Sequence, residues 1–194
     1  YMNVARIGTA SQGVAAAERS YQGASAYAIE RLAMRSLSGF KNPNGPADAI
    51  IEHPDVRRML LTQRVIAEGG RAMITHASQY ADLYRNGKST KDRKSAEQKL
   101  GFCTPILKGF ITELGVEAAN LGIQVYGGHG YIKEWGMEQI FRDSKIATLY
   151  EGTTGIQALD LIGRKVLLDK FTQLKIFSKA VSYTHLTLPT SSRV

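Results

Sequence analysis

Apolar side chains recur every three or four residues over long stretches of this chain, whereas no strand-like alternation lasts more than a few positions. The clearest stretch begins near Pro54, whose fixed φ and missing N–H suit the first turn of a helix, and stops at Asn86 and Gly87. Such spacing places the apolar side chains on one face of an α-helix. The pattern predicts an all-α fold, an antiparallel bundle of long helices with short connections. The predicted apolar face of this helix comprises Val56, Met59, Leu60, Ile66, Ala67, Met73, Ile74, Ala77, Tyr80, Ala81 and Tyr84.

Helix-forming composition predicts four further helices. The first is rich in alanine and is followed by a loop of glycine, asparagine and proline at residues 39–46. The polar run 88–99 is interpreted as a solvated loop that leads into the next helix. The four helices are expected at about residues 3–37, 104–125, 137–148 and 154–168.

The expected packing surfaces of two of these helices follow from the same spacing. For the last helix they are Ile156, Leu159, Leu161 and Ile162. For the helix at 104–125 the expected inner side comprises Ile106, Leu107, Phe110, Ile111, Leu114, Ala118 and Leu121.

The end of the chain differs in kind from the rest. From Val181 the sequence loses the helical period and most of its charge. It resembles the conceptual translation of a transposase-type sequencing adapter, so we interpret residues 181–194 as a non-native tail and exclude them from fold reasoning. The alternative is a disordered natural C-terminus. The expected organisation is one helical domain over residues 1–170 and a helix end or linker at 171–180.

Composition excludes several classes of protein. The single cysteine, Cys103, excludes a disulfide framework and a cysteine-cluster metal site, and it predicts a reducing compartment such as the cytoplasm. No apolar run approaches the roughly 18 to 20 residues that a membrane span requires. The net charge of +8 suits nucleic acid, an anionic surface or phosphorylated ligands. Because Lys and Arg are spread over several helices, without a tight cluster interleaved with aromatics, we do not expect nucleic-acid binding.

A carboxylate at Glu151 is the first candidate for chemistry. It precedes a flexible glycine, Gly152, and two hydroxyl residues, Thr153 and Thr154, that can cap the next helix. Glu151 is therefore expected at the rim of the bundle, where partial shielding from water would let it act as a general base. The alternative is an exposed loop acid beside a threonine cap.

Glycines and arginines supply candidates for ligand binding. The segment from Gln124 to Tyr131 packs three glycines into four residues, which would let the backbone approach a bulky ligand or would simply form a helix end and corner. No second ligand lies at a suitable spacing from His129, so no metal site is predicted. Guanidinium groups can grip a pyrophosphate, but they also commonly form solvated helix faces. The candidate arginines are Arg31, Arg35, Arg57, Arg58 and Arg64.

Taken together and in order, these segments resemble the C-terminal helical domain of the FAD-dependent acyl-CoA dehydrogenases. The resemblance covers about residues 2–168 and rests most strongly on 124–131, 141–146 and 150–153 at their mutual separations. In addition, residues 53–61 and 160–165 are similar to the larger branch that includes 3-methylmercaptopropionyl-CoA dehydrogenases. The resemblance implies that residues 1–170 are one domain of a longer enzyme.

The resemblance also implies a reaction, in which an acyl-CoA thioester loses an α-proton to a carboxylate and a β-hydride to FAD. Glu151 matches the family's base, and Ala5 stands where some members carry the base instead. The N–H of Glu151 would bind the thioester carbonyl, and Gly152 would let the acyl chain pass closely. Arg6 matches an arginine near the active site.

For the cofactor, the resemblance assigns contacts in two subunits. Arg31 matches the arginine that reaches the FAD pyrophosphate of a neighbouring subunit, and Gln124 and Gly128 match contacts to the adenine end across the dimer. Thr153 matches a contact near the FAD of its own subunit. These matches imply a homodimer or homotetramer, with an electron-transfer flavoprotein as the expected electron acceptor.

Two alternatives to a dehydrogenase stay open. An acyl-CoA oxidase shares the base and the first half-reaction but uses oxygen as acceptor. A non-catalytic helical binding module would keep the bundle without the reaction. Since the sequence contains neither the N-terminal helical domain nor the middle β-domain of the family, we expect this polypeptide to be inactive alone.

Overall fold

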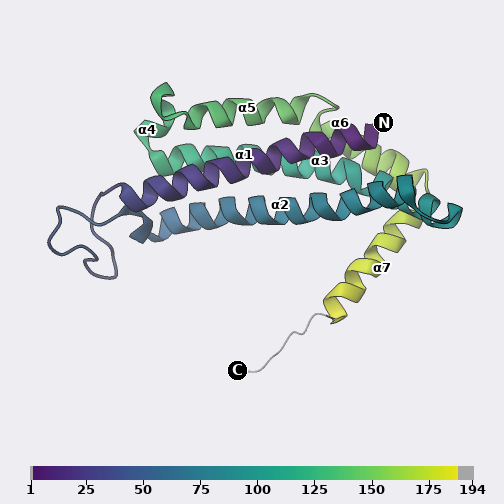
Figure 1. Cartoon of the computed structure of the whole chain (residues 1–194), viewed down its shortest axis with the longest axis horizontal. Coiled ribbons are helices and arrows are strands. Elements are labelled where there is room, and N and C mark those ends of the chain that lie inside the picture. Colours follow the sequence, from purple (N-terminus) through teal and green to yellow (C-terminus); the bar gives the residue numbers. More distant parts are fainter. Residues whose placement is uncertain (1, 188–194) are drawn as a thin grey trace.

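The computed structural model describes residues 2–187, and within that range the chain is helical, with no strand beyond an isolated bridge between Leu32 and Ala49. Three long helices, α1 (Met2–Glu30), α2 (Pro54–Asn86) and α3 (Thr90–Tyr126), pack together in alternating directions (Figure 1). A fourth, α5 (Met137–Leu149), packs on α1 and α3. The predicted all-α antiparallel bundle is confirmed.

Short helices connect and extend this bundle. The turn η1 (Ile50–Glu52) precedes α2, and α4 (Gly128–Tyr131) with η2 (Lys133–Trp135) forms the corner between α3 and α5. After α5 come α6 (Thr154–Leu159) and the π-helical segment η3 (Asp160–Leu167). The last helix, α7 (Thr172–Thr187), leaves the bundle at an angle (Figure 1).

The core consists of small and branched apolar side chains distributed along the three long helices. Its centre contains Ala17, Ala118 and Ile66, which lie on α1, α3 and α2 respectively. Glycines let α1 and α3 pack backbone against backbone, since a Cβ built on Gly13 would lie 2.5 Å from the Ile111 carbonyl oxygen and one on Gly115 would lie 2.7 Å from Gly13 Cα. This close packing sets the relative position of the two helices that carry the candidate site residues.

Two helix boundaries differ from the prediction. The first helix ends at Glu30 rather than near residue 37. The third begins at Thr90 rather than 104, because the Ser89 hydroxyl caps it by accepting the N–H of Asp92 at 3.0 Å. The polar run 88–99 is thus mostly the exposed start of α3, and its charged residues are compatible with a solvated helix.

Some side chains predicted to be inside are exposed. Phe110, expected on the inner side of α3, is 53% exposed. In the segment 154–168, which the structure divides between α6 and η3, the side chains of Ile156, Leu159 and Ile162 are also exposed. The three- and four-residue spacing predicted the helices correctly. It did not predict which of their apolar side chains are buried within residues 2–187.

The segment predicted as a helix end or linker, 171–180, lies largely within α7. The helix also continues past Val181 to Thr187, although the sequence loses its apolar period there. Residues 188–194 of the predicted non-native tail lie outside the described part of the chain. The foreign origin of that tail stays a prediction.

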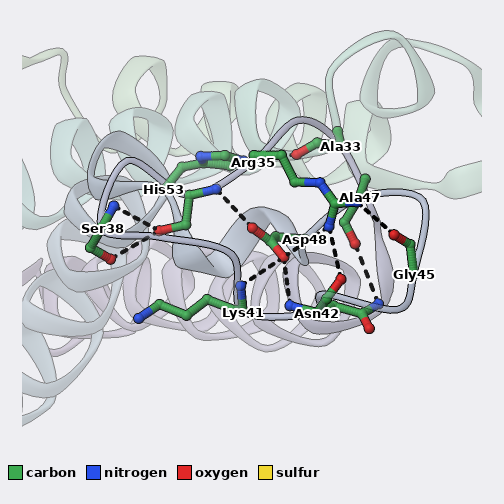
Figure 2. A network of polar contacts seen from close by, with 10 residues as sticks. Ala33, Arg35, Ser38, Lys41, Asn42, Gly45, Ala47, Asp48 and His53 are labelled. Atoms are coloured by element: carbon green, nitrogen blue, oxygen red, sulfur yellow. Dashed lines mark hydrogen bonds and ion pairs between the residues drawn. The ribbon is translucent and has the colours of Figure 1, made fainter.

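The loop between α1 and η1 is organised around the buried carboxylate of Asp48 (Figure 2). Its oxygens accept the backbone N–H groups of Ser36 at 2.8 Å, Lys41 at 3.0 Å and Asn42 at 2.7 Å. These hydrogen bonds, that of Ser36 foremost, lower the pKa of Asp48, and Arg35 at 3.5 Å adds an opposite charge. A loop rich in glycine and proline is thereby given one defined shape.

None of the helices in residues 2–187 combines the length and the apolar character that crossing a membrane would require.

Candidate functional site

The turn between α5 and α6 carries Glu151 in an unusual backbone conformation. Its φ is +56° and that of Gly152 is +88°, so both residues occupy the left-handed region. For a non-glycine residue this conformation costs about 1–3 kcal/mol, and it persists only where surrounding contacts hold it. Side-chain amide hydrogens on Gln157 Nε2 bind the carbonyl oxygens of Glu151 and Gly152, both at 3.0 Å.

The Glu151 side chain is half-buried, and its carboxylate has no hydrogen-bond or ion-pair partner among residues 2–187. Gly152 is required beside it, because a Cβ there would lie 2.8 Å from Gln157 Nε2. Thr153 caps α6 through Oγ1, which accepts the N–H of Ile156 at 3.4 Å. The predicted arrangement of acid, glycine and capping threonine is therefore present, and the carboxylate is unpaired within the described chain.

A buried lysine that sequence reasoning missed lies behind this turn. Lys108 of α3 is fully buried, and its Nζ donates to the Gly152 carbonyl oxygen at 2.6 Å. Burial lowers the pKa of Lys108, while the nearby carboxylates of Glu113 and Glu151 act to raise it. The sequence signal for its burial was its spacing, because Lys108 lies four residues after Thr104 and four before Thr112, on the buried face of α3.

Arg6 of α1 reaches the same end of the bundle. Its guanidinium forms an ion pair with Asp160, the first residue of η3, and the two side chains are only 12% and 8% exposed. The positive charge of Arg6 contributes to lowering the pKa of Lys108, which places the two cations in one electrostatic environment. Arg6, Glu151, Gly152 and Lys108 thus form one polar region between α1, α3 and α6.

The candidate arginines Arg35, Arg57, Arg58 and Arg64 are ion-paired with nearby acids, with Asp48, Glu52, Asp55 and Glu68 respectively.

The remaining candidates, Arg31, Gln124 and Gly128, lie at the other end of the bundle, around the α4 corner, which Figure 1 shows at the far end of α1 from the N-terminus. A pocket of about 360 Å³ is lined there by Arg31, Tyr27, Gly128 and His129 among others. Gln124 is exposed on the last turn of α3 beside this corner, where its carbonyl oxygen accepts the Gly127 N–H at 3.1 Å. The structure therefore brings Arg31 and Gly128 to one pocket, with Gln124 beside it.

Aromatic rings hold this corner against α1. Tyr27 stacks on Tyr126 with ring centroids 4.2 Å apart, and His129 stacks on Trp135 at 4.7 Å. Tyr27 Oη and His129 Nδ1 are hydrogen-bonded at 2.8 Å. These contacts pack α1, α3, α4 and η2 against one another around the pocket.

The residues at this corner fit the phosphate portion of a dinucleotide cofactor. Arg31 is exposed, and its guanidinium has no hydrogen-bond or ion-pair partner within the described chain. A Cβ built on Gly127 or Gly128 would meet nothing within 4 Å, so the backbone there faces open space. A free guanidinium beside an accessible backbone suits a pyrophosphate. In contrast, no three His, Cys, Asp or Glu side chains in residues 2–187 are placed to hold a metal ion.

The two regions lie at opposite ends of the long helix α1. Arg6 and Glu30 are separated by 24 helical positions of α1, or about 36 Å at a rise of about 1.5 Å per residue. Arg31 follows Glu30 directly, whereas α6, which Thr153 caps, lies beside the N-terminal end of α1 (Figure 1), where Arg6 pairs with Asp160 just after α6. Within a single chain, the Glu151 carboxylate and the Arg31 guanidinium are therefore separated by most of the length of α1.

Comparison with known proteins gives a family for this fold and these segments. Residues 1–167 match the family described as "Acyl-CoA dehydrogenase, C-terminal domain". The 3-methylmercaptopropionyl-CoA dehydrogenase of Ruegeria pomeroyi is 45% identical over 183 residues, which are 94% of this chain and 30% of that protein. A butyryl-CoA dehydrogenase of Syntrophomonas wolfei is 34% identical over 169 residues, or 87% of this chain and 27% of that protein. The chain thus spans less than a third of the length of these relatives.

Solved structures support the same fold. ACDH-11 of Caenorhabditis elegans, determined in complex with C11-CoA, superposes with a TM-score of 0.71 at 24% identity. The match covers 83% of this chain and 25% of that one. At this identity the likeness concerns the arrangement of the helices.

Proposed function

Because this chain belongs to the acyl-CoA dehydrogenase family, we propose that it is the part of an FAD-dependent acyl-CoA dehydrogenase that carries the catalytic base, Glu151. One observation supports this proposal above the others. The backbone of Glu151 is fixed in a left-handed turn by buried donors, while its carboxylate has no partner among the described residues. A fixed backbone with a free carboxylate is what a positioned general base requires.

The proposed chemistry is α,β-dehydrogenation of an acyl-CoA thioester. The Glu151 carboxylate removes the weakly acidic α-proton, and the backbone N–H of Glu151 donates a hydrogen bond to the thioester carbonyl as negative charge develops on it. Gly152 carries no side chain, so the acyl chain can pass close to the turn. FAD, when bound, would accept the hydride that leaves the β-carbon.

We assign the α4 corner to the cofactor of a neighbouring subunit. Arg31 would bind its pyrophosphate, and Gln124 and Gly128 would contact its adenine end. The length of α1 supports this assignment, because it separates Arg31 from the Glu151 region of the same chain. A homodimer or homotetramer would then be the active form.

Near the base, Thr153 and Arg6 have proposed supporting roles. Thr153 would contact the FAD of its own subunit, in addition to capping α6. Arg6 would provide positive charge at the substrate end while Asp160 holds its guanidinium. We expect an electron-transfer flavoprotein to be the electron acceptor and the cytoplasm to be the compartment.

Anaerobic titration of the full-length, FAD-loaded protein tests this function. Either 3-methylmercaptopropionyl-CoA or butyryl-CoA, the substrates named for two relatives, is expected to bleach the flavin absorbance. Absence of bleaching with a series of acyl-CoA thioesters would contradict the proposal and favour a non-catalytic helical module. If air then reoxidises the flavin rapidly, the enzyme is an acyl-CoA oxidase instead.

A further inference from the structure

Two buried side chains from different helices bind the same carbonyl group behind the Glu151 turn. Lys108 Nζ of α3 donates to the Gly152 carbonyl oxygen at 2.6 Å, and Gln157 Nε2 of α6 donates to it at 3.0 Å. Gln157 also donates to the Glu151 carbonyl oxygen at 3.0 Å. The two successive carbonyl groups of the left-handed turn are therefore both directed at these donors.

Close packing of α3 on α6 makes this arrangement possible. Gly109, next to Lys108, lies so near α6 that a Cβ on it would be 3.5 Å from Gln157 Cβ. Both donors are almost completely shielded from water, with Gln157 only 2% exposed. In such surroundings a hydrogen bond is stronger than in water, and losing it leaves a costly unpaired group.

In the described part of the chain, these two side chains make no other hydrogen bonds. The amide oxygen of Gln157 is buried without a partner, so the orientation of the amide is set by its two bonds to the turn. The charges of Glu113, Glu151 and Arg6 act on the pKa of Lys108, but its ammonium donates its hydrogen bond to the Gly152 carbonyl oxygen. Burying a cation costs desolvation free energy, so the burial of Lys108 indicates that the conformation of this turn is functionally important.

We propose that Lys108 and Gln157 are positioning residues, which hold Glu151 and Gly152 in the left-handed conformation and so keep the Glu151 carboxylate where the α-proton of the substrate will lie. This inference rests on the proposed role of Glu151 as the base. Neither residue needs to touch substrate or cofactor, because both act through the backbone carbonyls.

Steady-state kinetics of the full-length holoenzyme test the proposal with two variants. Lys108→Met and Gln157→Met each remove the donors while keeping a long buried side chain. Because small displacements of a catalytic group are costly, each is expected to lower kcat by about 10- to 100-fold. KM and FAD content should change little, whereas the thermal midpoint is expected to fall because each variant loses a buried hydrogen bond. Lys94→Met, an exposed lysine on the same helix, is the matched control and should leave every parameter unchanged.

The outcomes separate the inference from the function on which it rests. If Glu151→Gln abolishes turnover but both methionine variants retain the wild-type kcat, the positioning role is wrong and the base assignment stands. If kcat falls only in proportion to FAD content, the two residues are merely structural and the inference is also wrong. If Lys108→Met does not fold, Gln157→Met alone decides. Full turnover by Glu151→Gln would instead overturn the proposed function.

Discussion

The carboxylate of Asp48 shows how one residue can determine the shape of a loop. It accepts three backbone N–H groups, and those hydrogen bonds lower its pKa in the folded chain. A lowered folded pKa means that the stabilisation is complete above the unfolded value of about 3.9 and is lost as the pH falls through the folded value. We therefore predict that amide hydrogen exchange at Ser36, Lys41 and Asn42, corrected for its intrinsic pH dependence, loses protection below about pH 4.

The same loop provides a control at neutral pH. Asp48→Asn removes the charge and one of the two equivalent acceptors, so protection at these three amides should already be reduced at pH 7 and should depend less on acid. Unchanged protection in this variant would show that the loop is ordered by other contacts.

The ion pair between Arg6 and Asp160 leads to a prediction about stability. Removing one partner of a largely buried pair leaves the other charge uncompensated, which typically costs about 3–5 kcal/mol. Asp160→Asn should lower the free energy of unfolding by that order in urea titrations. Asp82→Asn, on the exposed side of α2, should have almost no effect, and the double variant Arg6→Met/Asp160→Leu should recover much of the loss. No difference between Asp160→Asn and Asp82→Asn would contradict the buried pair.

At the level of single residues, the sequence identified the turn at Glu151–Thr153 but not the buried Lys108 that binds it. Glu151, Gly152 and Thr153 are adjacent in the chain, so their pattern is visible in the sequence. Lys108 is 43 positions from Glu151, and a lysine in a helix is usually solvated. Only the packing of α3 on α6 shows that this lysine is buried against the turn.

The crossing of α1 and α3 predicts the effect of adding single methyl groups. Gly115→Ala would place a Cβ 2.7 Å from the backbone of Gly13, so the helices would have to separate. Overpacking of this kind typically costs about 1–3 kcal/mol in the free energy of unfolding. Gly8→Ala is the control on α1, because its Cβ would meet nothing within 4 Å; it should stabilise the helix by about 0.5–1 kcal/mol. If both variants unfold at the same urea concentration, the close crossing is wrong.

Helix boundaries set by proline and glycine, such as those of α2, were predicted best. Pro54 begins α2 and Gly87 follows its end, as the sequence indicated. The start of α3 was not predicted because an exposed helix has few apolar residues and so shows no clear apolar period. The end of α1 was not predicted because contacts of the following loop with Asp48 compete with the local helix propensity. Capping by Ser89 was the local signal that would have identified Thr90.

The separation of the two polar regions determines what the whole chain can do alone. The chain carries the proposed base at one end and the free guanidinium of Arg31 at the other, and it spans less than a third of its relatives. We predict that the isolated polypeptide neither binds FAD stoichiometrically nor dehydrogenates an acyl-CoA. Equilibrium dialysis with FAD and an acyl-CoA assay check this prediction; stable one-to-one binding with turnover would contradict it.

The exposed apolar side chains also belong to the scale of the whole molecule. Phe110, Ile156 and Leu159 lie on helices whose period was recognised, yet they face away from the core that this chain forms. Sequence periodicity shows that an apolar side chain lies on a helix, but it does not show whether the core of this chain covers that side chain. For that reason the fold of the bundle was predictable, whereas the complete site was not.

Exchange of the substrate α-protons tests the central assignment most directly. In the full-length holoenzyme with its FAD chemically reduced beforehand, no hydride can be accepted, so a bound acyl-CoA in D₂O can only exchange its α-protons. We expect the wild-type enzyme and Glu117→Gln, an exposed acid on α3, to exchange them at similar rates. Glu151→Gln should slow the exchange by about 10²- to 10⁴-fold. Exchange at the wild-type rate in Glu151→Gln would show that another group is the base.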